Sequence, residues 1–173
     1  MNIDLFDRLI NQQENGKSFR IGVIGLGKFA TMFLSQAKST PGIEISAIAD
    51  LNYKNAEAAI RSANFEKNLN TSGFNEAQAS NQIWYTDSGL DLAECDQLDL
   101  VIEATGNPEA AVDHCLAAFN AKSHVVLVTV EADVLCGSAI IKKANEAGVI
   151  CSMAYGDQPA LICELIDRVK SSG

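Results

Sequence analysis

Phe19-Arg20-Ile21-Gly22-Val23-Ile24-Gly25-Leu26-Gly27-Lys28-Phe29-Ala30 predicts a buried strand that runs into a glycine turn and then a helix. Gly25, Gly27 and Ala30 match the G-x-G-x-x-G/A spacing of dinucleotide-binding turns. Gly25 permits the tight turn, Gly27 lets the backbone approach a pyrophosphate, and Ala30 lets the helix pack closely on the strand. The free N–H groups of the first helical turn and the helix dipole favour negative charge there.

Taken alone, this triplet is weak evidence, because a plain structural turn can have the same spacing. The apolar strand before it and the helical pattern after it favour the dinucleotide-binding interpretation. We therefore expect the turn to contact the cofactor through six consecutive residues: Gly25, Leu26, Gly27, Lys28, Phe29 and Ala30.

Composition limits the classes of function. A chain of 173 residues is enough for one core and one domain. Its net charge of −9 argues against nucleic acid and anionic membranes as partners. The chain contains no apolar run approaching ~18 residues and no signal-peptide pattern, which favours a cytoplasmic protein. The cysteines lie far apart, without metal-ligand spacing, and are typical of reduced core thiols: Cys95, Cys115, Cys136, Cys151 and Cys163.

Strands and helices alternate along the chain. An amphipathic helix over 3–13 precedes the first strand. Residues 64–81 are polar and predict a loop with one helical turn near 75–79. The pattern predicts an α/β fold, a doubly wound parallel Rossmann sheet of six strands in the order 3-2-1-4-5-6 with an extra N-terminal helix. The six expected strands are 19–24, 43–50, 83–86, 99–104, 124–129 and 149–152.

Asp50 ends the second strand, 20 residues after Ala30. An acid at this position hydrogen-bonds the adenosine ribose and repels a 2′-phosphate, which favours NAD over NADP. The alternative is an aspartate that caps the next helix. Lys54 lies one helical turn further on and softens the discrimination, so both NAD and NADP stay open as cofactors.

Other loops follow strands at the same edge of the sheet, where ligands bind in open α/β folds. The loop after the third strand should lie near the adenosine, the next near the nicotinamide ribose, and the one after the fifth strand nearer the nicotinamide. Ordinary turn chemistry is the alternative for Gly106 and Pro108. From these loops and the end of strand two we expect further cofactor contacts at Leu51, Thr86, Ala104, Thr105, Gly106, Asn107, Val130 and Glu131.

Glu131 and Asp157 are the candidates for the catalytic, substrate-facing side of the site. Asp157 follows the sixth strand, where a helix cap is an equally good interpretation. His114 and His124 are poor catalytic candidates, because His114 is in the middle of a helix and His124 begins a strand at its amino end. We expect both histidines to be solvated or structural.

Five segments together carry a family resemblance: Ile24–Phe33, Ala47–Leu51, Val101–Pro108, Val130–Leu135 and Ala154–Leu165. The chain resembles the nucleotide-binding half of the homoserine dehydrogenase-like oxidoreductases. It is most similar to the branch that includes the 1-deoxy-D-xylulose-5-phosphate reductoisomerase-like and SAF-domain enzymes.

The resemblance implies an NAD(P)-dependent oxidoreductase that moves a hydride to or from a carbonyl or alcohol carbon of a small molecule. It also implies that residues 1–173 are one Rossmann domain, with 1–16 as its N-terminal helix, of a longer homo-oligomeric protein with a second domain. Homoserine dehydrogenases have an Asn-Lys pair where this chain has Glu131-Ala132, which disfavours homoserine. A non-catalytic dinucleotide sensor or assembly module is the alternative, and S-adenosylmethionine binding a weaker one.

Overall fold

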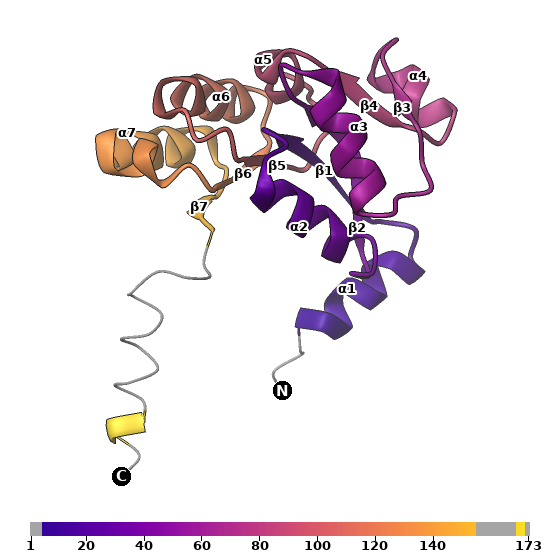
Figure 1. Cartoon of the computed structure of the whole chain (residues 1–173). Helices are drawn as coiled ribbons and strands as arrows, with labels where there is room; N and C mark the ends of the chain where they lie inside the picture. The colour runs from indigo at the N-terminus through magenta and orange to yellow at the C-terminus, as the bar shows by residue number, and fades with distance from the viewer. Residues whose placement is uncertain (1–4, 155–168, 172–173) are drawn as a thin grey trace.

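The computed structural model describes residues 5–154 and 169–171. In this part of the chain, seven parallel strands form one sheet in the order β3-β4-β2-β1-β5-β6-β7 (Figure 1). The strands are β1 (Phe19–Ile24), β2 (Ile43–Ala49), β3 (Leu69–Asn70), β4 (Ile83–Thr86), β5 (Leu100–Glu103), β6 (His124–Leu127) and β7 (Cys151–Met153). The helices are α1 (Leu5–Glu14), α2 (Lys28–Ala37), α3 (Tyr53–Ser62), α4 (Phe74–Ala79), α5 (Gly89–Ala93), α6 (Pro108–Asn120) and α7 (Val130–Ala147).

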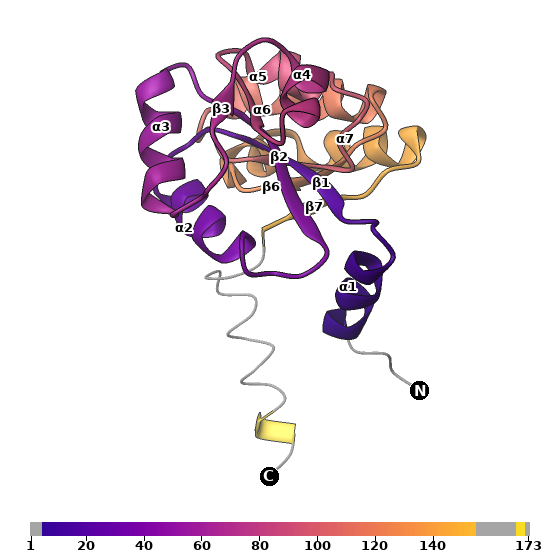
Figure 2. The same cartoon turned by 90° about the vertical axis from the view of Figure 1, so that its right-hand side faces the viewer.

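Two hydrophobic cores lie on opposite faces of the sheet. Helices α2 and α3 cover one face, and α5, α6 and α7 cover the other (Figure 2). Successive strand residues face opposite sides, so Val101 packs into one core and Ile102 into the other. Burial on both faces explains why the strands are apolar runs rather than alternating patterns.

The six predicted strands are present in the predicted order, and the predicted helical turn is α4. The prediction is wrong at Leu69–Asn70, where a two-residue edge strand replaces the expected loop. Leu69 pairs with Ile83 and Asn70 with Trp84 on β4. The pairing arises because β4 offers a free edge, and nothing in the local polar sequence signals it.

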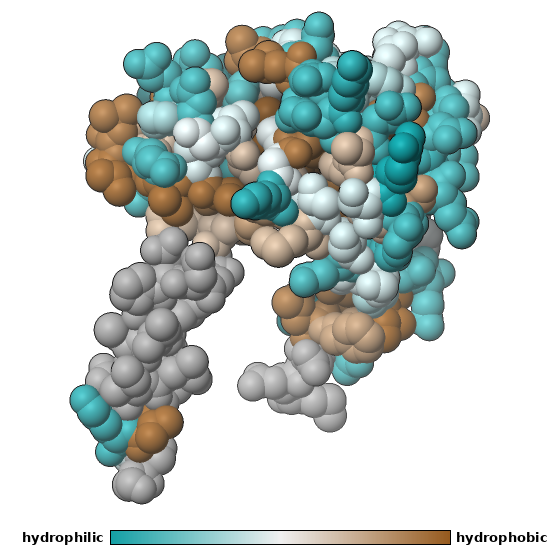
Figure 3. All heavy atoms as spheres, viewed as in Figure 1, coloured by the Kyte–Doolittle hydropathy of each residue, from teal (hydrophilic) through white to brown (hydrophobic). Residues whose placement is uncertain are grey.

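The N-terminal helix α1 lies at the outside of the domain and has no buried residue. It contacts the turn before β2, where the side chain of Gln13 accepts a hydrogen bond from Gly42 N at 3.2 Å. Leu5 and Phe6 are exposed, and Figure 3 shows apolar residues gathered over this helix. The helix is therefore an addition to the α/β fold and does not form part of its core.

The longest described helix is α7, with 18 residues and a break at Cys136, whose φ is −151°. Gly148 ends it in the left-handed conformation, with φ of 76°. Among the described residues, no helix is long and apolar enough to span a membrane. The first turn of α7 follows β6, so it lies at the carboxyl edge of the sheet.

Candidate functional site

The glycine turn joins β1 to α2 and packs directly against the loop after β5. Gly25 has φ of +86°, and a Cβ there would lie 2.6 Å from the carbonyl oxygen of Ala104. Its N–H donates to the carbonyl of Ala49 on β2 at 2.8 Å. Only glycine fits both the conformation and the space, which gives Gly25 the role that the sequence predicts for it.

Gly27 is the N-cap residue of α2, and it leaves the start of this helix open. Its backbone is extended, and no side chain caps the helix. A Cβ on Gly27 would meet no atom within 4 Å. Lys28 and Phe29 are exposed, whereas Ala30 is fully buried against the sheet. The first turn of α2 thus has no side-chain cap, and the space beside Gly27 is open, which suits the binding of a phosphate group at a helix N-terminus.

Asp50 anchors the turn to the end of β2. Its Oδ2 accepts a hydrogen bond from Leu26 N at 2.9 Å, and its Oδ1 accepts from Asn52 N at 2.9 Å and Asn55 Nδ2 at 3.0 Å. The side chain of Asn52, rather than that of Asp50, caps α3, because it accepts from Lys54 N. The capping alternative for Asp50 is therefore not what the structure shows. One of its roughly four acceptor sites stays available for a ligand.

A cleft of about 480 Å³ opens at the carboxyl edge of the sheet, between these segments. It brings together five of the predicted cofactor residues: Gly25, Asp50, Leu51, Thr105 and Asn107. The rest of its lining is Ile24, Ala49, Asn52, Asn55, Asp87, Gly89, Ala110 and His114. The other predicted contacts do not line it: Leu26, Gly27, Lys28, Phe29, Ala30, Thr86, Ala104, Gly106, Val130 and Glu131.

The loop after β5 forms the second wall of the cleft. The side chain of Asn107 caps α6 by accepting from the backbone N–H groups of Glu109 and Ala110. Gly106, with φ of +70°, donates its N–H to the buried hydroxyl of Thr129 at 3.0 Å. The loops after β5 and β6 are thereby held together at the edge where the sequence places the nicotinamide.

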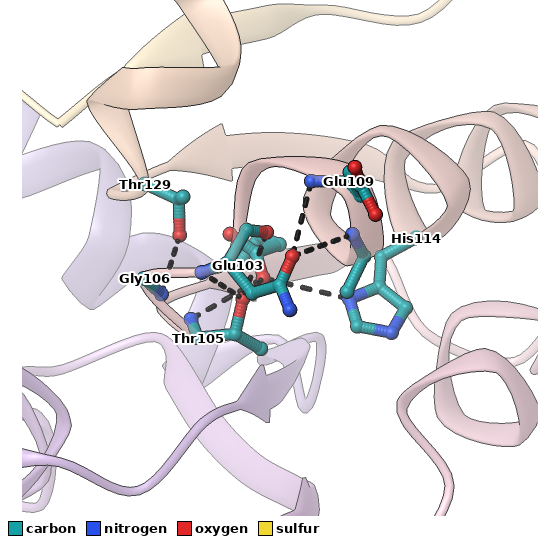
Figure 4. A network of polar contacts seen from close by, with 8 residues as sticks. Glu103, Thr105, Gly106, Glu109, His114 and Thr129 are labelled. Atoms are coloured by element: carbon teal, nitrogen blue, oxygen red, sulfur yellow. Dashed lines mark hydrogen bonds and ion pairs between the residues drawn. The ribbon is translucent and has the colours of Figure 1, made fainter.

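A buried carboxylate lies behind this loop (Figure 4). Glu103, at the end of β5, has no exposed surface. Its Oε1 accepts from Thr105 Oγ1 at 2.5 Å and Thr105 N at 3.2 Å, and His114 Nδ1 lies 3.4 Å away. Burial raises the pKa of Glu103, but hydrogen bonds from His114 and Thr105, with a contribution from Thr129, outweigh it and hold the pKa below its ordinary value.

The sequence did not single out Glu103, and it placed His114 as a solvated or structural residue. The structure buries His114, which is 8% exposed, and lets it line the cleft from α6. The available signal was a glutamate at the end of an apolar strand, in Val101-Ile102-Glu103-Ala104. A charge in such a run needs a partner, and the partner comes from another element.

Of the two predicted catalytic carboxylates, Glu131 lies within the described residues. Glu131 lies in the first turn of α7, is exposed, and does not line the cleft. Asp157 lies outside the described residues. Thr86 helps to hold Asp50 in place through its backbone, because its carbonyl oxygen accepts a hydrogen bond from Asp50 N at 3.3 Å.

A family model described as the oxidoreductase family with an NAD-binding Rossmann fold (GFO_IDH_MocA) matches residues 19–155. A search of curated proteins found no match. The scyllo-inositol dehydrogenase from Lactobacillus casei is similar in structure, at 15% identity and a TM-score of 0.60, over 89% of this chain and 42% of that one.

Two further solved structures are similar. The homoserine dehydrogenase from S. aureus is 18% identical, with a TM-score of 0.56, over 82% of this chain and 34% of that one. The WlbA dehydrogenase from Chromobacterium violaceum, in complex with NADH and UDP-GlcNAcA, is 16% identical, with a TM-score of 0.57, over 80% of this chain and 35% of that one. This chain thus spans less than half of each of these proteins, and the likeness establishes the fold.

Proposed function

The chain belongs to the GFO/IDH/MocA oxidoreductase family, which has an NAD-binding Rossmann fold, and on this premise we propose that it binds NAD as the cofactor-binding part of a dehydrogenase. The observation that carries the proposal is the open start of α2. No side chain caps it at Gly27, and the space that a Cβ would occupy there is empty. A pyrophosphate would occupy this space and accept hydrogen bonds from the N–H groups of the helix N-terminus.

The cleft and the start of α2, which follows Gly25, would hold different parts of a dinucleotide. The first turn of α2 would bind the pyrophosphate through its N–H groups. Asp50 would accept a hydrogen bond from the adenosine ribose, and Thr105 and Asn107 would border the other nucleotide. The chemistry that NAD supplies is hydride transfer at its nicotinamide ring, so the protein's part is to bind, orient and exclude water.

We propose that the cofactor is NAD rather than NADP, because the side chains that line the cleft carry negative charge. Among the described residues that line it there is no lysine or arginine, whereas Asp50 and Asp87 are both acidic. A 2′-phosphate beside Asp50 would be repelled by a charge that is already fixed in place by three hydrogen bonds. Lys54 does not line the cleft and offers no compensating contact there.

Replacing Asp50 by Ala should narrow the difference between the NADH and NADPH dissociation constants by about ten-fold, since one unit charge a few ångströms away contributes roughly 1–4 kcal/mol. The measurement is equilibrium titration with both nucleotides. Asp50→Asn separates charge from structure, because it keeps an acceptor for the turn. Asp113→Asn, an exposed change on α6, is the control. An unaltered ratio in both Asp50 variants would remove Asp50 from the ribose site.

We further propose a small molecule with a carbonyl or alcohol group as the substrate, and a homo-oligomer for the whole protein. Support for the homoserine dehydrogenase-like and 1-deoxy-D-xylulose-5-phosphate reductoisomerase-like assignment comes from the sequences at 130–135 and 154–165. The similar dehydrogenases are more than twice as long as this chain. Glu131 and Asp157 remain the proposed residues on the substrate side.

One observation favours a second function, a dinucleotide sensor or assembly module without catalysis. Glu131 is exposed and lies outside the cleft, and such a module needs no acid or base. The two functions are separated by following the near-ultraviolet absorbance of NADH during incubation of the native protein with aldehydes and ketones. Oxidation of NADH supports the dehydrogenase, whereas tight binding without turnover of any of them supports the sensor.

A further inference from the structure

Glu103 presents an unusual arrangement for a buried charge. The carboxylate is completely buried, and its Oε2 has no close hydrogen-bond partner among the described residues. Its closest hydrogen bonds are made by Oε1, to Thr105 and His114, and the hydroxyl of Thr129 adds a weaker contact. A buried carboxylate with one oxygen that lacks a close partner destabilises the fold relative to an apolar side chain of similar size. Its presence therefore calls for an explanation other than stability.

The contacts of Glu103 converge on the loop that borders the cleft. The hydroxyl proton of Thr105 is donated to the carboxylate, so that Thr105 Oγ1 is left to accept from Asn107 N at 3.2 Å. The Thr105 N–H is bound to the same carboxylate oxygen. One carboxylate thus orients a backbone N–H, a hydroxyl and, through that hydroxyl, the residue that caps α6.

His114, on α6, contacts the same carboxylate oxygen of Glu103 as Thr105 does. Its ring lies so close to Gly89, at the start of α5, that a Cβ on Gly89 would overlap His114 Nε2. The ring therefore has little room to turn away from Glu103. Glu103 itself does not line the cleft, so it acts on a ligand only through the residues that it holds.

The loop held by Glu103 lies on the far side of the glycine turn from Asp50. Asp50 ends β2 and Thr105 follows β5, and these strands flank β1 on opposite sides. In doubly wound sheets a dinucleotide lies across this point, with one nucleotide on each side. If the adenosine ribose lies at Asp50, the nicotinamide ribose lies at Thr105.

We propose that Glu103 is a positioning residue for the nicotinamide half of the cofactor. It fixes Thr105 and Asn107 in the conformation that receives the nicotinamide ribose, and His114 locks the carboxylate in place. The proposal rests on the proposed NAD-binding function and adds that different residues of the cleft bind the two halves of the cofactor. The adenosine half is bound independently of Glu103.

The test compares NADH with ADP, which lacks the nicotinamide and its ribose, by calorimetric titration of the full chain. Thr105→Val removes the hydroxyl that Glu103 holds while keeping the volume of the side chain, and Thr105→Ser keeps the hydroxyl. We expect Thr105→Val and Glu103→Gln each to weaken NADH about ten-fold and ADP less than two-fold, as expected for the loss of about one hydrogen bond to a charged group. Thr105→Ser should restore NADH affinity, and Glu109→Gln, an exposed change in the first turn of α6, is the charge control.

The double variant shows whether Glu103 acts through Thr105. Combining Glu103→Gln with Thr105→Val should weaken NADH no more than either change alone. Equal losses for NADH and ADP, additive losses, or no loss would each overturn the proposal, and the comparison of NADH with ADP in Thr105→Val decides it even if Glu103→Gln does not fold. Failure of the unaltered chain to bind either nucleotide would instead overturn the NAD-binding function and this inference with it.

Discussion

We expect the substitution Gly27→Val to abolish NADH binding and to leave the fold nearly intact. The backbone of Gly27 is extended, with φ of −78°, a conformation that valine readily adopts. The Cβ of a valine at this position would meet no atom within 4 Å. The new methyl groups would fill the space next to the first turn of α2, where the pyrophosphate is proposed to bind. Losing two charge-assisted hydrogen bonds of about 1.5–3 kcal/mol each weakens binding at least roughly 100-fold.

The measurements for Gly27→Val are NADH titration and thermal unfolding. The melting temperature should stay within about 3 °C of the unaltered chain, which corresponds to roughly 1 kcal/mol for a domain of this size. Gln36→Val is the matched control, because it adds the same side chain on an exposed position of the same helix. If Gly27→Val bound NADH as tightly as Gln36→Val, the glycine would be a purely structural residue.

Unlike Gly27→Val, the substitution Gly25→Ala should lower the stability of the fold itself. A Cβ at this position would lie 2.6 Å from Ala104 O and 2.8 Å from Thr105 Cα, which are backbone atoms of another strand end. The left-handed conformation adds its own strain, and together we expect a loss of about 3 kcal/mol in the free energy of unfolding. Because Gly25 supports the loop after β5, cofactor binding should be lost as well.

Chemical denaturation of Gly25→Ala measures this loss, and Gly148→Ala is its control. Gly148 has a similar φ of 76°, but a Cβ there would meet no atom within 4 Å. The control therefore reports conformational strain alone, at about 1 kcal/mol. Equal destabilisation in the two variants would show that the contact between the glycine turn and the loop after β5 does not constrain the fold.

The fold was predictable because its signals are local and repeated. Each of the main strands is an apolar run, and β1 has the predicted bounds. The strand order follows from the rules for doubly wound sheets, and the predicted relationship to NAD(P)-binding oxidoreductases is confirmed at the level of the family. The edge strand at Leu69–Asn70 was missed because its pairing partner, and not its own sequence, creates it.

The positions of some cleft residues were predictable, because spacing in the sequence alone determines them. Gly25 and Asp50 line one cleft, as expected from the glycine turn and the 20 residues between Ala30 and Asp50, and their contact with the cofactor stays a prediction. Asp50 has a second role, in accepting the hydrogen bond from Leu26 N. This contact depends on the register between β1 and β2, for which the sequence has no pattern. The Glu103–His114 pair was missed for a similar reason, since it joins a strand end to the middle of a helix across the core.

The central claim is that the open start of α2 and the cleft beside it bind NAD. The most direct measurement is calorimetric titration of the 173-residue chain with NADH. We expect saturable binding of one molecule per chain, with a dissociation constant below about 1 mM, that is displaced by ADP. Absence of heat or fluorescence change with both NADH and NADPH at millimolar concentration would contradict the claim.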